Sequence, residues 1–419
     1  MSGLSPASKK AVIATLVISL VLLFASMTAP LLSYIGYAYP NDNPYLIVQI
    51  PAFVGMLVSF AVGPLAMKVN LKWLMVVSAV TAFIYFAIFA LIGSNGPFIA
   101  LVIGAGIVGV CQGAAMVLTS SIFGAYVTDP LQRANFVAIS GALMNGGAAI
   151  VNVVGGIIAA GGTPAGSNWP MAYYLGILIL PALVVYFIMM PMKPDAPGEV
   201  GGEGGPGGPP VATGFIPVRV FLIIGLGLIV TLGMAVFLLN VGMYIEGELG
   251  AGGLLLGLSG GPASSTDAGL ANSLFTILGV VAGFSFPFVV KFLKAWIAPI
   301  GYFIGGLGLF VMVFMKTSII GILAGACLCG LGFNIAMPFV MGQILALTPP
   351  RWVPVAMSIN MGIMNLMFTF VPNIMGGLGG LFDGTIATQI LIGGVFVMVA
   401  VVLAVFLFVF VKAPAAQED

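Results

Sequence analysis

Carboxamide side chains are the polar groups best able to do chemistry in the apolar stretches of this 419-residue chain. A carboxamide both donates and accepts hydrogen bonds, so in apolar surroundings each one needs a neighbouring helix or a bound solute as its partner. The middle of each apolar stretch lacks Asp, Glu, Lys and Arg, which favours a neutral or amphiphilic solute over a carboxylate or a phosphate. The candidate side chains are Gln49, Gln112, Asn145, Asn152, Asn240, Asn272, Asn334, Asn360, Asn365 and Asn373.

Groups that could carry a coupling ion are few, and the chain has no histidine. Glu246 and Glu248 stand where an apolar stretch ends, and burial there would raise a carboxyl pKa enough to hold a proton. The alternative is that both are ordinary solvated loop acids. A sodium site built from carbonyl, Ser and Asn oxygens stays open, as does transport without any coupling ion.

Sulfur side chains offer a second kind of chemistry, because the chain has 23 methionines and three cysteines. Thioethers and thiols bind Cu(I), whereas flexible methionines also fill irregular gaps beside small residues. We favour packing and expect no bound metal or cofactor, and Cu(I) remains an alternative as cargo. The residues concerned are Met337, Met341, Met357, Met361, Met364, Cys327 and Cys329.

An enzyme is not expected. A membrane-embedded enzyme needs a nucleophile with its base, an acid–base pair or a metal site. The apolar stretches carry no histidine, no acidic pair and no Ser–Lys constellation.

The elements that must position these side chains are membrane-spanning helices. The chain is 61% hydrophobic and only 5% charged, and a soluble protein would carry about a quarter charged residues. A spanning helix needs roughly 20 apolar residues. We therefore predict an all-α polytopic membrane protein. Its twelve predicted spans are 11–36, 46–66, 73–93, 98–127, 135–160, 170–192, 215–245, 269–290, 296–315, 318–347, 352–381 and 386–411.

The basic residues predict how these spans are oriented. Eleven of the twelve Lys and Arg residues fall on alternate loops, and only Lys316 falls on the opposite side. Loops rich in Lys and Arg stay in the cytoplasm, so both termini are expected inside a plasma (inner) membrane. Because the basic residues are spread as topological markers, no nucleic-acid partner is expected. The cytoplasmic set is Lys9, Lys10, Lys68, Lys72, Arg133, Lys193, Arg219, Lys291, Lys294, Arg351 and Lys412.

Two halves of six spans each are predicted. Residues 193–214 are rich in Gly and Pro and indicate a flexible linker between a bundle at 1–192 and a bundle at 215–419. The halves also echo each other: Gly104 matches Gly325 at an offset of 221 residues, and Asn145 matches Asn365 at an offset of 220. That equivalence makes Asn145 and Asn365 our preferred substrate-binding residues. The Gly-rich outer loop 247–268 has no assigned role.

The loop after the second predicted span carries a resemblance to a known family. It reads Gly63-Pro64-Leu65-Ala66-Met67-Lys68-Val69-Asn70-Leu71-Lys72, which resembles the Gly-x-Leu-Ala-Asp-Arg-x-Gly-Arg-Lys motif of the major facilitator superfamily. The resemblance implies that Gly63, Lys68 and Lys72 belong to a cytoplasmic gate loop. Met67 replaces the acid of that gate, so a role for the two lysines as topology determinants alone stays open.

The same resemblance implies a transporter of two six-helix bundles with its substrate site between them. Spans 4, 7 and 10 of the family line the cavity, which adds Gln112, Asn240 and Asn334 to the expected site. The fourth span reads Gly109-Val-Cys-Gln112-Gly113 and lacks the Arg that the family's proton-driven drug antiporters carry there. That difference disfavours an exporter of that type.

We therefore expect a monomeric secondary transporter that moves a small neutral or amphiphilic solute across a lipid bilayer by alternating access. Three alternatives stay open: a proton-coupled drug or metabolite exporter, a lipid flippase and a Cu(I) importer. The coupling ion, if there is one, would be H⁺ or Na⁺.

Overall fold

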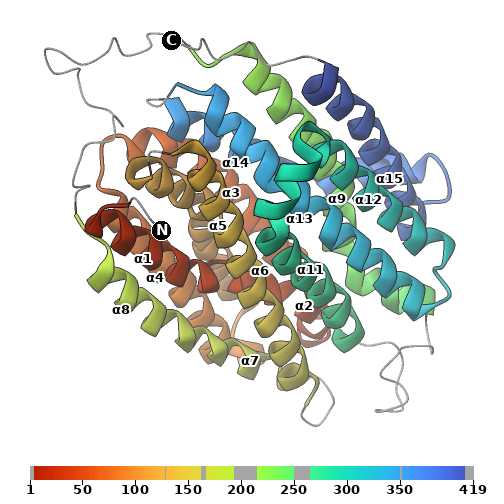
Figure 1. Cartoon of the computed structure of the whole chain (residues 1–419). Helices are drawn as coiled ribbons and strands as arrows, with labels where there is room; N and C mark the ends of the chain where they lie inside the picture. Colours follow the sequence, from red (N-terminus) through yellow and green to blue (C-terminus); the bar gives the residue numbers. More distant parts are fainter. Residues whose placement is uncertain are drawn as a thin grey trace, which may run out of the picture.

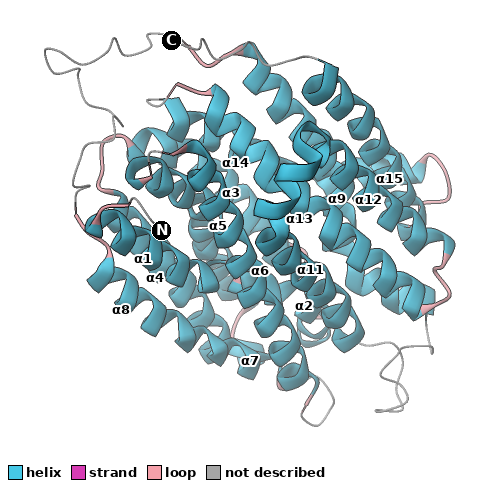
Figure 2. Ribbon diagram, viewed as in Figure 1, coloured by secondary structure: helices cyan, strands magenta, loops and turns pink. Residues whose placement is uncertain are grey.

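The computed structural model describes residues 4–127, 129–161, 167–192, 215–249, 265–349 and 352–410, and these ranges form helices joined by short loops (Figures 1 and 2). Within them no strand is present. The predicted linker 193–214 and most of the outer loop 247–268 lie outside the described residues. We call residues 4–192 the first half and residues 215–410 the second half.

In the first half, 3₁₀ helices interrupt the first and the last span. In chain order its elements are α1 (Pro6–Leu22), the 3₁₀ helix η1 (Phe24–Met27), α2 (Thr28–Ala38), α3 (Leu46–Ala66), α4 (Leu71–Ile92), α5 (Phe98–Tyr126), α6 (Pro130–Ala160), α7 (Trp169–Ala172), the 3₁₀ helix η3 (Tyr173–Leu178) and α8 (Ile179–Met189).

The second half has longer continuous helices. They are α9 (Val218–Leu249), α11 (Ser265–Leu293), the 3₁₀ turn η4 (Lys294–Trp296), α12 (Ile297–Phe314), α13 (Ile319–Leu347), α14 (Val353–Gly380) and α15 (Ile386–Ala404), which continues as a π-helical turn over Val405–Phe410.

Eleven helical segments of the described residues are long and apolar enough to cross a membrane. Ten of them each match one predicted span. The eleventh, Gly269–Phe314, has 46 residues and joins α11 to α12 through η4. Two of the twelve predicted spans, 269–290 and 296–315, fall within it. Lys294 has a φ of 48°, a conformation that ends an α-helix, so α11 and α12 are separate helices.

Two of the predicted spans are broken by 3₁₀ helices, which the sequence analysis did not anticipate. Proline lacks an N–H and clashes with the carbonyl group four residues earlier. Pro30 places that clash at Ser26 within η1, and Pro181 places it at Ile177 within η3. A proline therefore weakens the helix at both interruptions.

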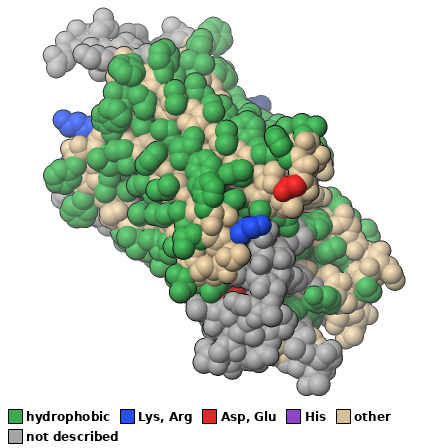
Figure 3. Space-filling model, turned by 90° about the vertical axis from the view of Figure 1, so that its right-hand side faces the viewer, with side chains coloured by type: hydrophobic (Ala, Val, Ile, Leu, Met, Phe, Trp, Pro, Cys, Tyr) green, Lys and Arg blue, Asp and Glu red, His purple; other side chains and the backbone are tan. Residues whose placement is uncertain are grey.

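Two helix pairs hold the halves together. Helix α3 packs against α14, and α6 packs against α11, so each pair contains one helix from each half. Within the halves, α3 packs on α5 and α12 packs on α13. Apolar side chains cover most of the outer face that Figure 3 shows. Phe303 of α12 and Val402 of α15 are among the exposed ones, as a lipid-facing surface requires.

Candidate functional site

A cavity of about 440 Å³ lies between the two halves. Helices α3, α5 and α6 line it from the first half, and α9, α11, α13 and α14 line it from the second half. The interrupted first span contributes Ser26 of η1 and Thr28 of α2. A pocket of this size suits a drug-sized or smaller molecule.

The polar lining of the cavity consists of carboxamides and hydroxyls. None of the residues that line it is Asp, Glu, Lys or Arg. A charged solute would therefore lose its hydration without gaining a counter-charge from the described wall. The six lining carboxamides are Gln112, Asn145, Asn272, Asn334, Asn360 and Asn365.

The apolar lining contains methionine and aromatic side chains beside small and branched aliphatic ones. Four of the methionines named from the sequence lie in it, whereas Met357, Cys327 and Cys329 do not. The Cys329 thiol instead donates to the Gly305 carbonyl at 3.3 Å. Methionine adapts its shape, so this wall can fit apolar bodies of different outline. The lining methionines are Met116, Met144, Met234, Met337, Met341, Met361 and Met364.

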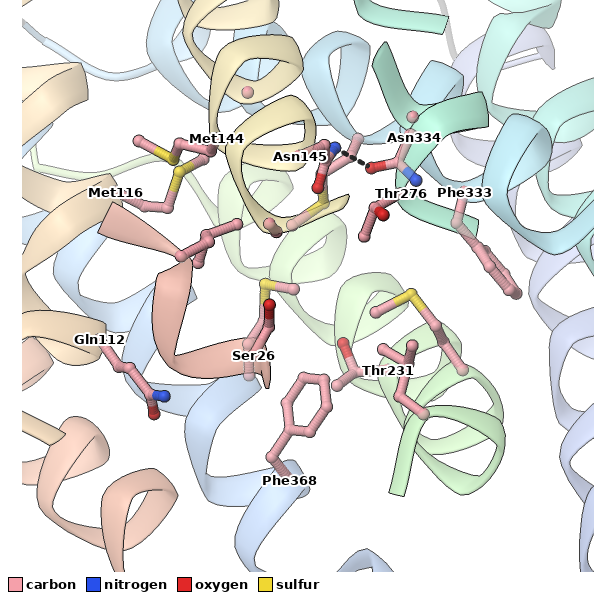
Figure 4. Close-up of a pocket in the computed structure, with 18 of the residues that line it drawn as sticks. Ser26, Gln112, Met116, Met144, Asn145, Thr231, Thr276, Phe333, Asn334 and Phe368 are labelled. Carbon is pink, nitrogen blue, oxygen red and sulfur yellow. Dashed lines mark hydrogen bonds between the residues drawn. The ribbon is translucent and has the colours of Figure 1, made fainter. Parts of the chain in front are cut away.

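Asn145 and Asn334 bind each other across the halves (Figure 4). Asn145 Nδ2–H donates to Asn334 Oδ1 at 2.9 Å, and Asn334 Nδ2–H donates to the Gly330 carbonyl at 2.8 Å. Gly279 of α11 lies beside this pair, because a Cβ there would stand 2.6 Å from Asn145 Nδ2. Two residues predicted separately from the sequence are thus brought into one contact.

Asn365 makes another polar contact between the halves. Its Nδ2–H donates to Ser59 Oγ of α3 at 3.1 Å, and Ser59 Oγ–H donates to the Gly113 carbonyl of α5 at 2.8 Å. Gly55 lies beside Asn365, with a Cβ position 3.5 Å from Asn365 Cγ. Ser59 is fully buried. The repeat-related residues Asn145 and Asn365 therefore both face the cavity and both bond to the other half.

The remaining expected amides differ in their use. Gln112 lines the cavity (Figure 4), and within the described residues its side chain makes no hydrogen bond. Asn272 also lines the cavity, and its side chain likewise makes no hydrogen bond within the described residues. Asn240 lies outside the lining, and its Nδ2–H donates to the Val236 carbonyl of its own helix at 3.0 Å. Gln112 and Asn272 are therefore the carboxamides most available to a ligand.

The residues of the expected gate loop occupy different environments. Gly63 lies against α14, since a Cβ there would stand 2.7 Å from the Pro354 carbonyl oxygen. Lys68 is exposed. Lys72 is buried, with Nζ 4.6 Å from the centre of the Phe187 ring of α8. Gly63 thus contacts the other half, whereas Lys72 contacts a helix of its own half.

The expected coupling acids lie in the last turn of α9. Glu246 and Glu248 belong to α9, and their side chains lie outside the described residues.

Three residues of the site were missed by sequence reasoning: Ser59, Gly55 and Gly279. The glycines match at an offset of 224 residues, close to the offsets of the other repeated positions. A repeat alignment extended back along the second span would have found them. Ser59 has no such signal, because its repeat-related position is Gly283.

Comparison with protein families gives one match: the family model of the Major Facilitator Superfamily matches residues 14–264. No curated protein matches the chain.

Solved structures with the same fold cover nearly the whole chain. The human organic anion transporter MFSD10 (TETRAN) has a TM-score of 0.73 at 12% identity, covering 96% of this chain and 100% of that one. The proton:xylose symporter XylE bound to 6-bromo-6-deoxy-D-glucose has a TM-score of 0.69 at 14% identity, covering 97% and 96%. The transporter FucP in the outward conformation has a TM-score of 0.68 at 14% identity, covering 94% and 98%. At such identities the likeness shows the fold alone.

Proposed function

The chain belongs to the major facilitator superfamily and is a multi-span membrane transporter, and we propose that it moves a small neutral or amphiphilic solute by alternating access. The protein is a secondary transporter and not an enzyme. The substrate class, the site residues and the membrane topology given below are proposals.

The observation that carries the proposed substrate class is the lining of the cavity. Its described wall combines six carboxamides with methionine and aromatic side chains and contains no charged side chain. Burying an unpaired charge costs far more than burying a hydrogen-bonded polar group, so an uncharged solute is favoured. The large apolar share of the wall favours a molecule with an apolar body over a fully hydroxylated one.

The structural neighbours transport substrates of different classes, so the substrate proposed here rests on the cavity lining. MFSD10 is an organic anion transporter and XylE is a proton:xylose symporter. An anion would need a cation in the wall, and the described lining offers none. A neutral substrate such as that of XylE is compatible with the lining, although the methionine wall suits a more apolar molecule.

We propose twelve spans in two six-helix bundles, with both termini in the cytoplasm. As one straight helix, the segment Gly269–Phe314 would measure about 69 Å at 1.5 Å per residue, more than twice a bilayer core of about 30 Å. The turn at Lys294 supports two crossings there. The asymmetry of Lys and Arg supports the orientation, a plasma (inner) membrane is the proposed location, and a cavity formed within one chain supports a monomer.

Coupling to H⁺ or Na⁺ remains a proposal. Glu246 and Glu248 remain the carboxyl candidates at the outer end of α9, because the wall of the cavity supplies no titratable acid. Replacing both with Gln should abolish the dependence of uptake on a pH gradient if either one carries the proton. An unchanged dependence would remove them from the site.

Uptake into proteoliposomes tests the proposed function. Purified full-length protein should exchange radiolabelled neutral amphiphiles and should not exchange size-matched carboxylates or quaternary ammonium compounds. Exchange of the charged compounds at equal rates would refute the proposed substrate class.

The site assignment makes a separate prediction. Asn145→Ala and Asn365→Ala should each lower uptake about tenfold, because each removes a polar partner from the cavity wall, while membrane insertion stays normal. Uptake rates are compared at equal amounts of inserted protein. Normal uptake in both single variants would show that neither residue belongs to the site.

A further inference from the structure

Two hydrogen bonds from one side chain to another join the halves in the described residues, and they are the most specific feature of the cavity. Asn145 Nδ2 to Asn334 Oδ1 and Asn365 Nδ2 to Ser59 Oγ each join one half to the other. Their donors are related by the 220-residue repeat, and each donor lies beside a glycine related by a 224-residue repeat. The two contacts thus stand in equivalent places in the two halves.

The acceptors of the two contacts differ in their access to the cavity. Asn334 is a lining residue, so both amides of the first contact face the cavity space. Ser59 is fully buried behind the wall and is held by its own bond to the Gly113 carbonyl. A ligand can therefore reach both members of the Asn145–Asn334 pair, but only the Asn365 side of the other.

The Asn145 carboxamide has hydrogen-bonding capacity left. Its Nδ2 donates to Asn334, while its Oδ1 accepts no hydrogen bond within the described residues. Figure 4 shows the nitrogen turned toward Asn334. A carboxamide offers a donor and an acceptor side by side, and an uncharged amide edge with its own N–H beside its C=O satisfies both at once.

We propose that the substrate carries an uncharged amide edge, as in a lactam, which pairs with Asn145 and replaces Asn334 as its partner. The substrate C=O accepts the Asn145 Nδ2–H that now donates to Asn334 Oδ1, and the substrate N–H donates to Asn145 Oδ1. Binding then releases Asn334 Oδ1 and breaks one of the two side-chain to side-chain hydrogen bonds that join the halves in the described residues, so recognition loosens the interface. This inference rests on the proposed transport function.

The neighbouring wall suits the rest of such a molecule. Met144, Met337 and Phe333 line the cavity close in sequence to the amide pair. A flat ring attached to the amide edge would lie against thioether and aromatic surfaces, which hold apolar rings well. The probes are therefore 2-quinolinone, a lactam on an aromatic ring, and 1-methyl-2-quinolinone, which has the same ring without the N–H.

Binding of both probes to the detergent-purified full-length protein is measured by the thermal shift they cause. The lactam should bind about fivefold to tenfold more tightly than its N-methyl derivative, since one hydrogen bond distinguishes them. In Asn145→Ala that ratio should fall to about one. In Asn365→Ala, the repeat-related control, the ratio should persist, and the ligand-free melting temperature of each variant checks its folding.

Asn334→Ala gives the sharper test. Because the substrate displaces Asn334, removing that side chain should leave lactam binding intact or strengthen it by up to about fivefold. A residue that simply contacts the substrate would weaken binding when removed. Weaker lactam binding in Asn334→Ala, an unchanged ratio in Asn145→Ala, or no binding of either probe would each overturn the inference.

Uptake separates this inference from the proposed function. If 1-methyl-2-quinolinone or another neutral amphiphile without an N–H enters proteoliposomes as fast as the lactam, neutral-solute transport stands and the amide edge is wrong. If no neutral amphiphile is taken up, the proposed function itself fails.

Discussion

The helix pair α12–α13 of the second half and the pair α4–α5 of the first half hold equivalent places in the repeat, but they pack by different means. In α12–α13, backbone meets backbone: a Cβ at Gly332 would stand 2.4 Å from the Gly301 carbonyl oxygen, and one at Gly308 would stand 2.6 Å from that of Gly325. In α4–α5, Gly104 faces side chains instead, with its Cβ position 3.0 Å from Ile88 Cγ2.

Helix α4 instead packs through a cluster of aromatic rings that includes Tyr173 of η3. The Tyr85 and Phe89 ring centres are 4.4 Å apart, and those of Phe89 and Tyr173 are 4.7 Å apart. Tyr85 also lines the cavity. Backbone contact leaves α12 and α13 few alternative packings, whereas rings can shift against each other. The difference indicates firm packing of α12 on α13, and a packing of α4 that is linked to the site through Tyr85.

The largest expected effect comes from the repeat-related glycines Gly325 and Gly104. An added Cβ at Gly325 would stand 2.4 Å from Met312 Cγ and 2.6 Å from the Gly308 carbonyl oxygen, so Gly325→Ala must push backbones apart. We expect it to lower the free energy of unfolding by about 2 kcal/mol or more, and Gly104→Ala to lower it by less than about 1 kcal/mol. Thermal unfolding in detergent measures both.

Gly325→Ala and Gly104→Ala serve as controls for each other, because they share the change in helix propensity. The gain in helix propensity from Gly to Ala is the same in both, about 1 kcal/mol, so it cancels and leaves the packing term. Gly225→Ala, where a Cβ meets nothing within 4 Å, should be neutral or stabilising. Equal losses at Gly325 and Gly104 would show that the two halves pack alike.

The sequence predicts the positions of the spans well, but it predicts poorly which face of each helix meets the cavity. The span 98–127 was predicted almost to the residue, because an apolar run of that length ends at polar loops; the helix is Phe98–Tyr126. Asn240 was expected at the site and lies outside the lining. Membrane helices are apolar toward lipid and toward their neighbours, so hydrophobic periodicity does not reveal which face of α9 meets the cavity. The repeat supplied that information for Asn145 and Asn365.

The next effect concerns the hydroxyl cluster of the first half. The Tyr85 and Thr28 hydroxyls are hydrogen-bonded, and Tyr173 Oη–H donates to Thr28 Oγ1 at 3.2 Å. Tyr85→Phe keeps the ring and removes one buried bond, so we expect a loss of about 1 kcal/mol in the free energy of unfolding, together with altered uptake.

Tyr302 of the second half provides the matched variant. Tyr302 also lines the cavity, and in the described part of the chain it makes no hydrogen bond. Tyr302→Phe should therefore change the melting temperature less than Tyr85→Phe does. A larger effect at Tyr302 would contradict the link between first-half packing and the site.

A smaller difference is expected at the lysines near the start of the equivalent helices α4 and α12. Lys72 is buried and stacks over the Phe187 ring, whereas Lys294, 222 residues later, is exposed. Lys72→Met should lower the free energy of unfolding by about 0.5–1 kcal/mol through the lost cation–π contact, and Lys294→Met should not. Thermal unfolding compares the pair. Equal effects at both positions would show that the contact with Phe187 does not contribute to the free energy of unfolding.

The smallest effect concerns the start of the last predicted span of each half, at α7 in the first half and at α15 in the second. The hydroxyl of Thr388 and the backbone N–H of Thr385 lower the pKa of Asp383 at the start of α15, whereas Asn168 at the start of α7 makes no capping bond. A carboxyl whose pKa is lowered by folding stabilises the folded state above its unfolded pKa, about 3.9, and loses that contribution as the pH falls through its folded value. Asp383→Asn should therefore lower the melting temperature slightly at pH 7 and should not change it near pH 2.

Asn168→Ala is the control and should have no pH-dependent effect. A difference between wild type and Asp383→Asn that persists at low pH would show that the charge of the Asp383 carboxylate does not distinguish the two helices.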